Sequence, residues 1–98
     1  MPMLSMDPYV VDTLMADLVG HDRQPSAYLV YLYLWRHTHG AGAVEVEIAL
    51  QDVAEGTGLS KRAVQEAVSR LVRRHLVEVR REVITSVGAY SVRQPWRR

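Results

Sequence analysis

The sequence predicts a mainly α-helical domain with a small β-hairpin, which is an α+β fold class. Two observations support this prediction. Apolar residues recur at helical spacing through much of the chain, and period-two alternation is confined to "VEVEI" (44–48) and to residues 76–93. With 98 residues, of which 48% are hydrophobic, the chain is long enough for one domain with a modest core and too short for two.

The first predicted element is an amphipathic helix in "DPYVVDTLMADLVG". Its apolar residues lie at i, i+1, i+4, i+5, i+8 and i+9 over residues 10–19, between Asp7-Pro8 and Gly20. This spacing places them on one face of a helix. We therefore assign residues 1–24 to an N-terminal helical segment.

The second predicted helix lies in "QPSAYLVYLYLWRHTHGAG", which is apolar without interruption over residues 27–35. Periodicity alone does not separate a helix from a buried strand here, but the length, Pro25 and Gly40 favour a helix. A helix that is apolar on every side must be covered all round. The first helix can cover it from the same chain or from a two-fold partner. We expect the partner arrangement, a homodimer, with these interface residues: Val10, Val11, Leu14, Met15, Leu18, Tyr31 and Trp35.

The alternation in "VEVEI" predicts a short strand at residues 44–48. A pair of helices follows this strand, in "LQDVAEGTGLSKRAVQEAVSRL". Ala54 is small enough for two helices to cross closely. Gly58 allows a turn conformation that a Cβ atom would resist, and Ser60 can cap the second helix. The second helix carries one apolar stripe, which we expect to face the core: Ala63, Val64, Ala67, Val68, Leu71 and Val72.

The last predicted element is a β-hairpin in "LVEVRREVITSVGAYSVRQPW", with a turn that contains Gly88. From about residue 25 to residue 93, this order of elements resembles the winged helix-turn-helix domains of bacterial transcriptional regulators of the MarR and GntR kind. The helix–Gly58–Ser60–helix stretch is the most specific part of the resemblance. Two residues depart from the pattern: Ala49 stands where a capping residue is common, and His75 where a glycine usually ends the second helix.

The resemblance implies that residues 25–98 form a winged helix-turn-helix domain that binds double-stranded DNA in a sequence-specific manner. The implied contacts of the recognition helix are Ser60, Lys61, Arg62, Gln65, Glu66, Ser69, Arg70 and Arg73. The implied contacts of the hairpin, or wing, are Arg80, Arg81 and Arg93, which we expect to position the DNA rather than to specify its sequence. An alternative is that the helix residues form a solvated face held by i, i+4 ion pairs.

The distribution of charge agrees with a nucleic-acid partner. The net charge is only +1, but residues 1–59 hold eight acids and two bases, a net −6, whereas residues 60–98 hold ten bases and three acids, a net +7. Phosphate neutralisation needs a local density of Lys and Arg. The other interpretation is that the charges are segregated by chance. A winged-helix module that binds protein instead of DNA is the alternative function.

Other chemistries have little support in the sequence. The chain has no cysteine, so no disulfide or thiolate site is possible. His37 and His39 would point apart on a helix, and the serines and histidines are not accompanied by a nucleophile elbow, a phosphate-binding glycine loop or a paired-carboxylate motif. We therefore expect no metal, no cofactor and no enzymatic activity. No stretch is apolar enough to span a bilayer, so we expect a cytoplasmic protein without a membrane partner. A small-molecule effector is left open.

Overall fold

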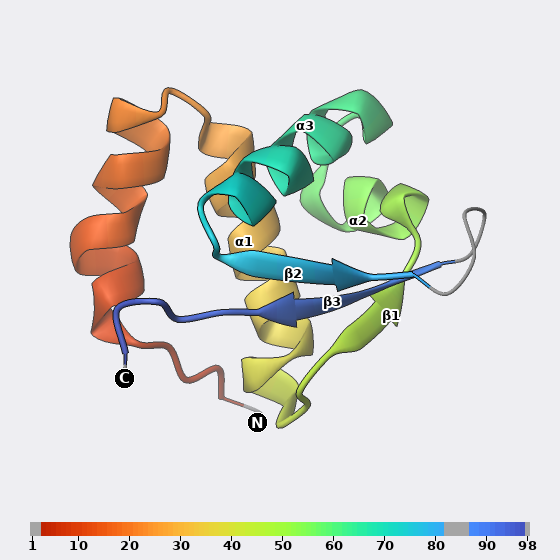
Figure 1. Ribbon diagram of the computed structural model, residues 1–98, viewed down its shortest axis with the longest axis horizontal. Coiled ribbons are helices and arrows are strands. Elements are labelled where there is room, and N and C mark those ends of the chain that lie inside the picture. Colours follow the sequence, from red (N-terminus) through yellow and green to blue (C-terminus); the bar gives the residue numbers. More distant parts are fainter. Residues whose placement is uncertain (1–2, 82–86, 98) are drawn as a thin grey trace.

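The computed structural model describes residues 3–81 and 87–97. These residues form a mainly helical α+β fold in which three strands make one antiparallel sheet, in the order β1-β3-β2 (Figure 1). The elements are η1 (Val10–Leu14), η2 (Ala16–His21), α1 (Pro25–His37), η3 (His39–Ala41), β1 (Val46–Ile48), α2 (Leu50–Thr57), α3 (Lys61–Arg73), β2 (Val77–Arg80) and β3 (Gly88–Val92).

The predicted first helix is present, but its winding is that of a π-helix. Met15 joins η1 to η2, and we refer to residues 10–21 as the N-terminal helix. The Met15 N–H donates to the carbonyl of Val10, five residues earlier. An α-helix turns once in 3.6 residues, so residues four apart drift around its surface. The wider i→i+5 winding reduces this drift, and Val10, Leu14 and Leu18 all lie in the core.

Helix α1 occupies the centre of the domain. The N-terminal helix lies along one side of it, and α3, α2 and the sheet lie against its other sides (Figure 1). The first helix therefore covers α1 from the same chain, which is one of the two arrangements that the sequence left open. This corrects the predicted interface, because five of its residues belong to the core of a single chain: Val10, Leu14, Leu18, Tyr31 and Trp35. Val11 and Met15 are exposed.

The connections at both ends of the helix pair agree with the sequence. Gly58 has a left-handed backbone, with φ of 78°. Ala49 precedes α2 without any side-chain cap. His75 has φ of 59°, so a non-glycine residue does accept the left-handed geometry after α3. The amide of His75 donates to the carbonyl of Val72 and that of Leu76 to the carbonyl of Leu71, which is a Schellman motif.

The hairpin differs from the prediction in the position of Gly88. Gly88 is the first residue of β3 and pairs with Ile48 of β1, so it does not lie in the turn. Within the hairpin, Val77 pairs with Val92 and Arg80 with Ala89. The expected tip of the wing lies largely at residues 82–86, outside the described residues.

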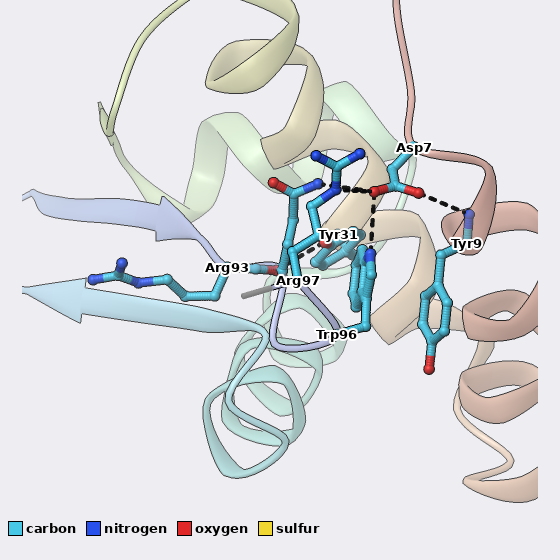
Figure 2. A network of polar contacts seen from close by, with 7 residues as sticks. Asp7, Tyr9, Tyr31, Arg93, Trp96 and Arg97 are labelled. Carbon is cyan, nitrogen blue, oxygen red and sulfur yellow. Dashed lines mark hydrogen bonds and ion pairs between the residues drawn. The ribbon is translucent and has the colours of Figure 1, made fainter.

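A cluster of polar contacts around Asp7 joins the two ends of the chain (Figure 2). Asp7 Oδ2 accepts from Arg97 Nε at 2.7 Å, Trp96 Nε1 at 3.1 Å and Gln94 Nε2 at 3.3 Å, while Oδ1 accepts from the Tyr9 amide at 3.0 Å. The rings of Tyr9 and Trp96 stack with their centroids 4.3 Å apart. The hydrogen bonds from Trp96, Tyr9 and Arg97 lower the pKa of Asp7 below its ordinary value of 3.8.

The Asp7 cluster predicts a pH-dependent contribution to stability. A lowered carboxyl pKa stabilises the fold above the unfolded-state pKa of about 4, and this stabilisation is lost as the pH falls below that value and through the lowered pKa of the folded state. Asp7→Asn should therefore reduce the free energy of unfolding at pH 7, and the difference from the wild type should shrink below about pH 4. Urea denaturation at several pH values measures both quantities. A difference that is independent of pH would contradict the role given to the Asp7 charge.

Candidate nucleic-acid interface

Helix α3 has one buried face and one free face. Val64, Ala67 and Leu71 are fully buried against the rest of the domain, as the predicted stripe requires, but the prediction is wrong for Val72, which is 41% exposed. The hydroxyl of Ser60 accepts from the Ala63 amide at 3.0 Å, so the predicted N-cap is present and fixes the start of the helix. These contacts hold the opposite, polar face of α3 in a defined orientation.

A groove runs between the polar face of α3 and the loop end of the hairpin strands, where Arg81, Val87 and Gly88 lie. It consists of two adjoining hollows of ≈ 330 and ≈ 420 Å³ that share Leu50, Gln65 and Arg81. We call it the α3–hairpin groove and define it by five polar side chains: Lys61, Gln65, Ser69, Arg73 and Arg81. The four residues from α3 are spaced by four, so they follow one another along the same side of the helix.

Other predicted contacts of the recognition helix lie outside this groove. Arg62 Nε is 3.3 Å from Glu66 Oε1, so these two exposed side chains form the i, i+4 ion pair that the sequence offered as the alternative. Arg70 faces the N-terminal segment, where its Nε donates to Gln24 Oε1 at 3.1 Å. The eight predicted helix residues therefore divide among different surroundings.

The end of α3 is tied to the N-terminal helix by charge. Arg74 lies 3.4 Å from Asp22 and 3.6 Å from Asp17. The hydrogen bond from His21 and, more weakly, the charge of Arg74 lower the pKa of Asp22. This arrangement restrains the end of the helix opposite Ser60.

The three predicted hairpin arginines divide between the two faces of the sheet. Arg80 Nη2 lies 2.6 Å from Glu45 Oε1, and Arg93 Nη2 lies 2.7 Å from Glu78 Oε2. Because successive strand residues point to opposite faces, Arg81 lies on the other side from Arg80, toward α3. There it lines the groove, and its Nη2 donates to the Tyr90 hydroxyl at 3.3 Å.

Ion pairing divides the bases in the C-terminal part of the described chain into two groups. Five of them form an ion pair with a carboxylate: Arg62, Arg74, Arg80, Arg93 and Arg97. Four have no carboxylate within ion-pair distance among residues 3–81 and 87–97: Lys61, Arg70, Arg73 and Arg81. Arg70 donates to Gln24 instead, and the other three line the α3–hairpin groove.

Sequence reasoning did not identify the partners of these arginines, namely Glu45, Glu78 and Tyr90. One signal was available: in "VEVRR" the period-two alternation that predicts the strand also requires Arg80 and Arg81 to face opposite ways. The partners themselves had no such signal, because Glu45 and Arg80 lie 35 residues apart.

The histidines are engaged in local contacts. His39 stacks on Trp35, and its Nε2 lies 3.1 Å from the Val92 carbonyl, while His37 lies against Tyr33. Within the described ranges, no group of three or more His, Cys, Asp or Glu side chains is arranged to hold a metal ion. The helices in these ranges are also too short or too polar to cross a membrane.

Comparison with known proteins adds no assignment to this geometry. The chain matches no protein-family model, no curated protein and no solved structure.

The capping geometry of α3 predicts a specific loss of stability. Ser60→Ala leaves the Ala63 amide without its partner and should lower the free energy of unfolding by about 1 kcal/mol. Ser69→Ala on the exposed face of the same helix is the matched control, and we expect it to change the value by less than about 0.5 kcal/mol. Chemical denaturation measures both variants. Equal effects would show that the cap does not fix the start of α3.

Proposed function

We propose that this chain is a winged helix-turn-helix domain that binds double-stranded DNA sequence-specifically, as a bacterial transcriptional regulator. One observation carries the proposal: of the four bases without a carboxylate partner in the described C-terminal part, three line one groove beside the polar face of α3, namely Lys61, Arg73 and Arg81. Double-stranded DNA presents a regular array of phosphates that such a groove can neutralise.

The arrangement of elements also supports the proposal. Helix α2 leads into α3 through the left-handed Gly58, and the β2–β3 hairpin follows α3 directly. Because α3 and the loop end of the hairpin strands border the same groove, a duplex could contact both at once. An α-helix fits the major groove of B-DNA, with its side chains directed to the base edges.

Within this proposal, the groove residues have different roles. Gln65 and Ser69 lie between Lys61 and Arg73 along the helix, so they are placed to contact base edges. Lys61, Arg73 and Arg81 would contact phosphates and fix the register of the protein on the duplex. Arg62 and Glu66 lie beside the groove as an ion pair. This assignment gives sequence readout to Gln65 and Ser69 and leaves Arg62 out of it.

The proposal predicts a contrast between neighbouring arginines. Arg81→Ala should weaken binding to preferred and random duplexes alike and should reduce the slope of log affinity against log salt by about 0.9, the value for one phosphate contact. Arg80→Ala removes the same charge from the other face of the hairpin and should change the slope much less. Fluorescence anisotropy titrations over a series of salt concentrations measure both slopes. Indistinguishable slopes for the two variants would contradict the groove as the phosphate site.

Base readout predicts a different pattern. On a site selected from a random duplex pool, Gln65→Ala should cost about 1–3 kcal/mol of binding free energy, and it should cost less on random DNA. The same titrations decide this. If the losses on the selected site and on random DNA are equal, Gln65 contacts the DNA backbone and not the bases.

The alternative function is a winged-helix module that binds protein. It replaces the proposed function if the wild-type protein is not retained on duplex DNA or heparin.

The homodimer remains a prediction, and it now rests on the apolar side chains that a single chain leaves exposed. Val11, Met15 and Val19 form an exposed apolar row on the outer side of the N-terminal helix. Sedimentation equilibrium at micromolar concentration should give twice the chain mass of 11.1 kDa, and Val11→Glu with Met15→Glu should restore the monomer without unfolding it. Leu14→Asp is the contrasting variant and should unfold the chain, because Leu14 is buried. A wild-type mass near 11.1 kDa would refute the dimer.

A further inference from the structure

The side chain of Arg81 is held in place by two residues of strand β3. Its Nη2 donates to the Tyr90 hydroxyl at 3.3 Å. A Cβ atom at Gly88 would lie 3.2 Å from Arg81 Nε and 3.2 Å from two ring carbons of Tyr90. The arginine therefore passes close over the backbone of Gly88 on its way to the tyrosine, a path that a side chain at position 88 would obstruct.

Tyr90 is a fixed anchor for this contact. It is 1% exposed and lies on the central strand, paired with Val46 on one side and with Val79 on the other. Its hydroxyl nevertheless reaches the α3–hairpin groove, which both Tyr90 and Arg81 line. A hydroxyl on a buried ring has little freedom to move, so it can restrict the exposed guanidinium that bonds to it.

Gly88 makes this approach possible. Arg80 pairs with Ala89 across the hairpin, so the next residue, Arg81, comes opposite Gly88. With alanine at position 88, the tight contact would be relieved most easily by the exposed, flexible arginine, because the Tyr90 ring is buried. Gly88→Ala should therefore displace the guanidinium without removing its charge.

We propose that Gly88 and Tyr90 are positioning residues that hold Arg81 as a preformed phosphate-binding group in the α3–hairpin groove. The inference rests on the proposed function and goes beyond it, because it says which residues prepare the site. A guanidinium has five N–H donors, and Tyr90 takes one of them. The others remain for the two non-bridging oxygens of a backbone phosphate, in the two-point geometry that arginine provides and lysine does not. An arginine that is already ordered loses less side-chain entropy when it binds.

The test combines Tyr90→Phe and Gly88→Ala with Arg81→Ala in titrations of random duplex DNA. Tyr90→Phe keeps the buried ring, so the fold should be retained, which circular dichroism checks. Loss of one positioning hydrogen bond should weaken DNA binding about two- to fivefold. The salt slope should stay unchanged, because the arginine charge remains. Gly88→Ala should behave in the same way.

The double variants separate positioning from a general structural effect. In the Arg81→Ala background, Tyr90→Phe and Gly88→Ala should have no further effect on DNA affinity, because the group that they position is absent. If either one weakens binding as much without Arg81 as with it, the positioning role is overturned while the proposed function stands. The Arg81→Lys variant should have the same DNA affinity as the double variant that combines Arg81→Lys with Tyr90→Phe. A clear difference between these two affinities would also overturn the positioning role. If the wild-type protein shows no salt-dependent affinity for DNA, the proposed function fails, and the positioning role fails with it.

Discussion

The burial of helix α1 on almost every side is the constraint on which the rest of this domain depends. Its aromatic residues bring polar atoms into the interior, and each atom finds a backbone carbonyl of a distant segment: Tyr28 Oη donates to Val10, Tyr31 Oη to Arg93 and Trp35 Nε1 to Ser5. Burial raises the pKa of both tyrosines, so they remain neutral donors. An unpaired donor in such a place costs about 1–3 kcal/mol. The N-terminal and C-terminal segments are therefore held to α1 by hydrogen bonds as well as by apolar contact.

Packing against this core determines the geometry of the candidate interface. Helix α3 packs its apolar stripe on α1, and β3 crosses the same helix, so the polar face of α3 and the strands of the hairpin have a fixed relation to each other (Figure 1). The Ser60 cap and the left-handed His75 define where α3 begins and ends. Side chains that are already ordered by such contacts lose less entropy when a partner binds.

The sequence predicted those features that depend on local chemistry. Helical spacing, the left-handed Gly58, the Ser60 cap and the alternation of β2 are all consequences of residues close in the chain, and the structure has them. It did not predict the π-winding of the N-terminal helix or the place of Gly88 within β3, since both depend on what packs against them. The long-range partners of the arginines could not be predicted from the sequence either. Arg80 of β2 pairs with Glu45, which directly precedes β1, and these two strands are connected in the sheet only through β3.

The folded structure also shows a second role for the uneven distribution of charge along the sequence. Several acids of the first 59 residues pair with bases of the last 39: Asp7 with Arg97, Asp17 and Asp22 with Arg74, and Glu45 with Arg80. Part of the segregation thus serves attraction between the two parts of one chain, and the formal +7 overstates what a partner would meet. An exposed pair such as Arg80–Glu45 is worth only about 0.2–1 kcal/mol and adds little to stability. The carboxylates of these pairs nevertheless stay beside the arginines and would repel a phosphate that approached there. Under the proposed function, the paired arginines are therefore poor phosphate sites, and a polyanion would be attracted mainly along the groove that Lys61, Arg73 and Arg81 line.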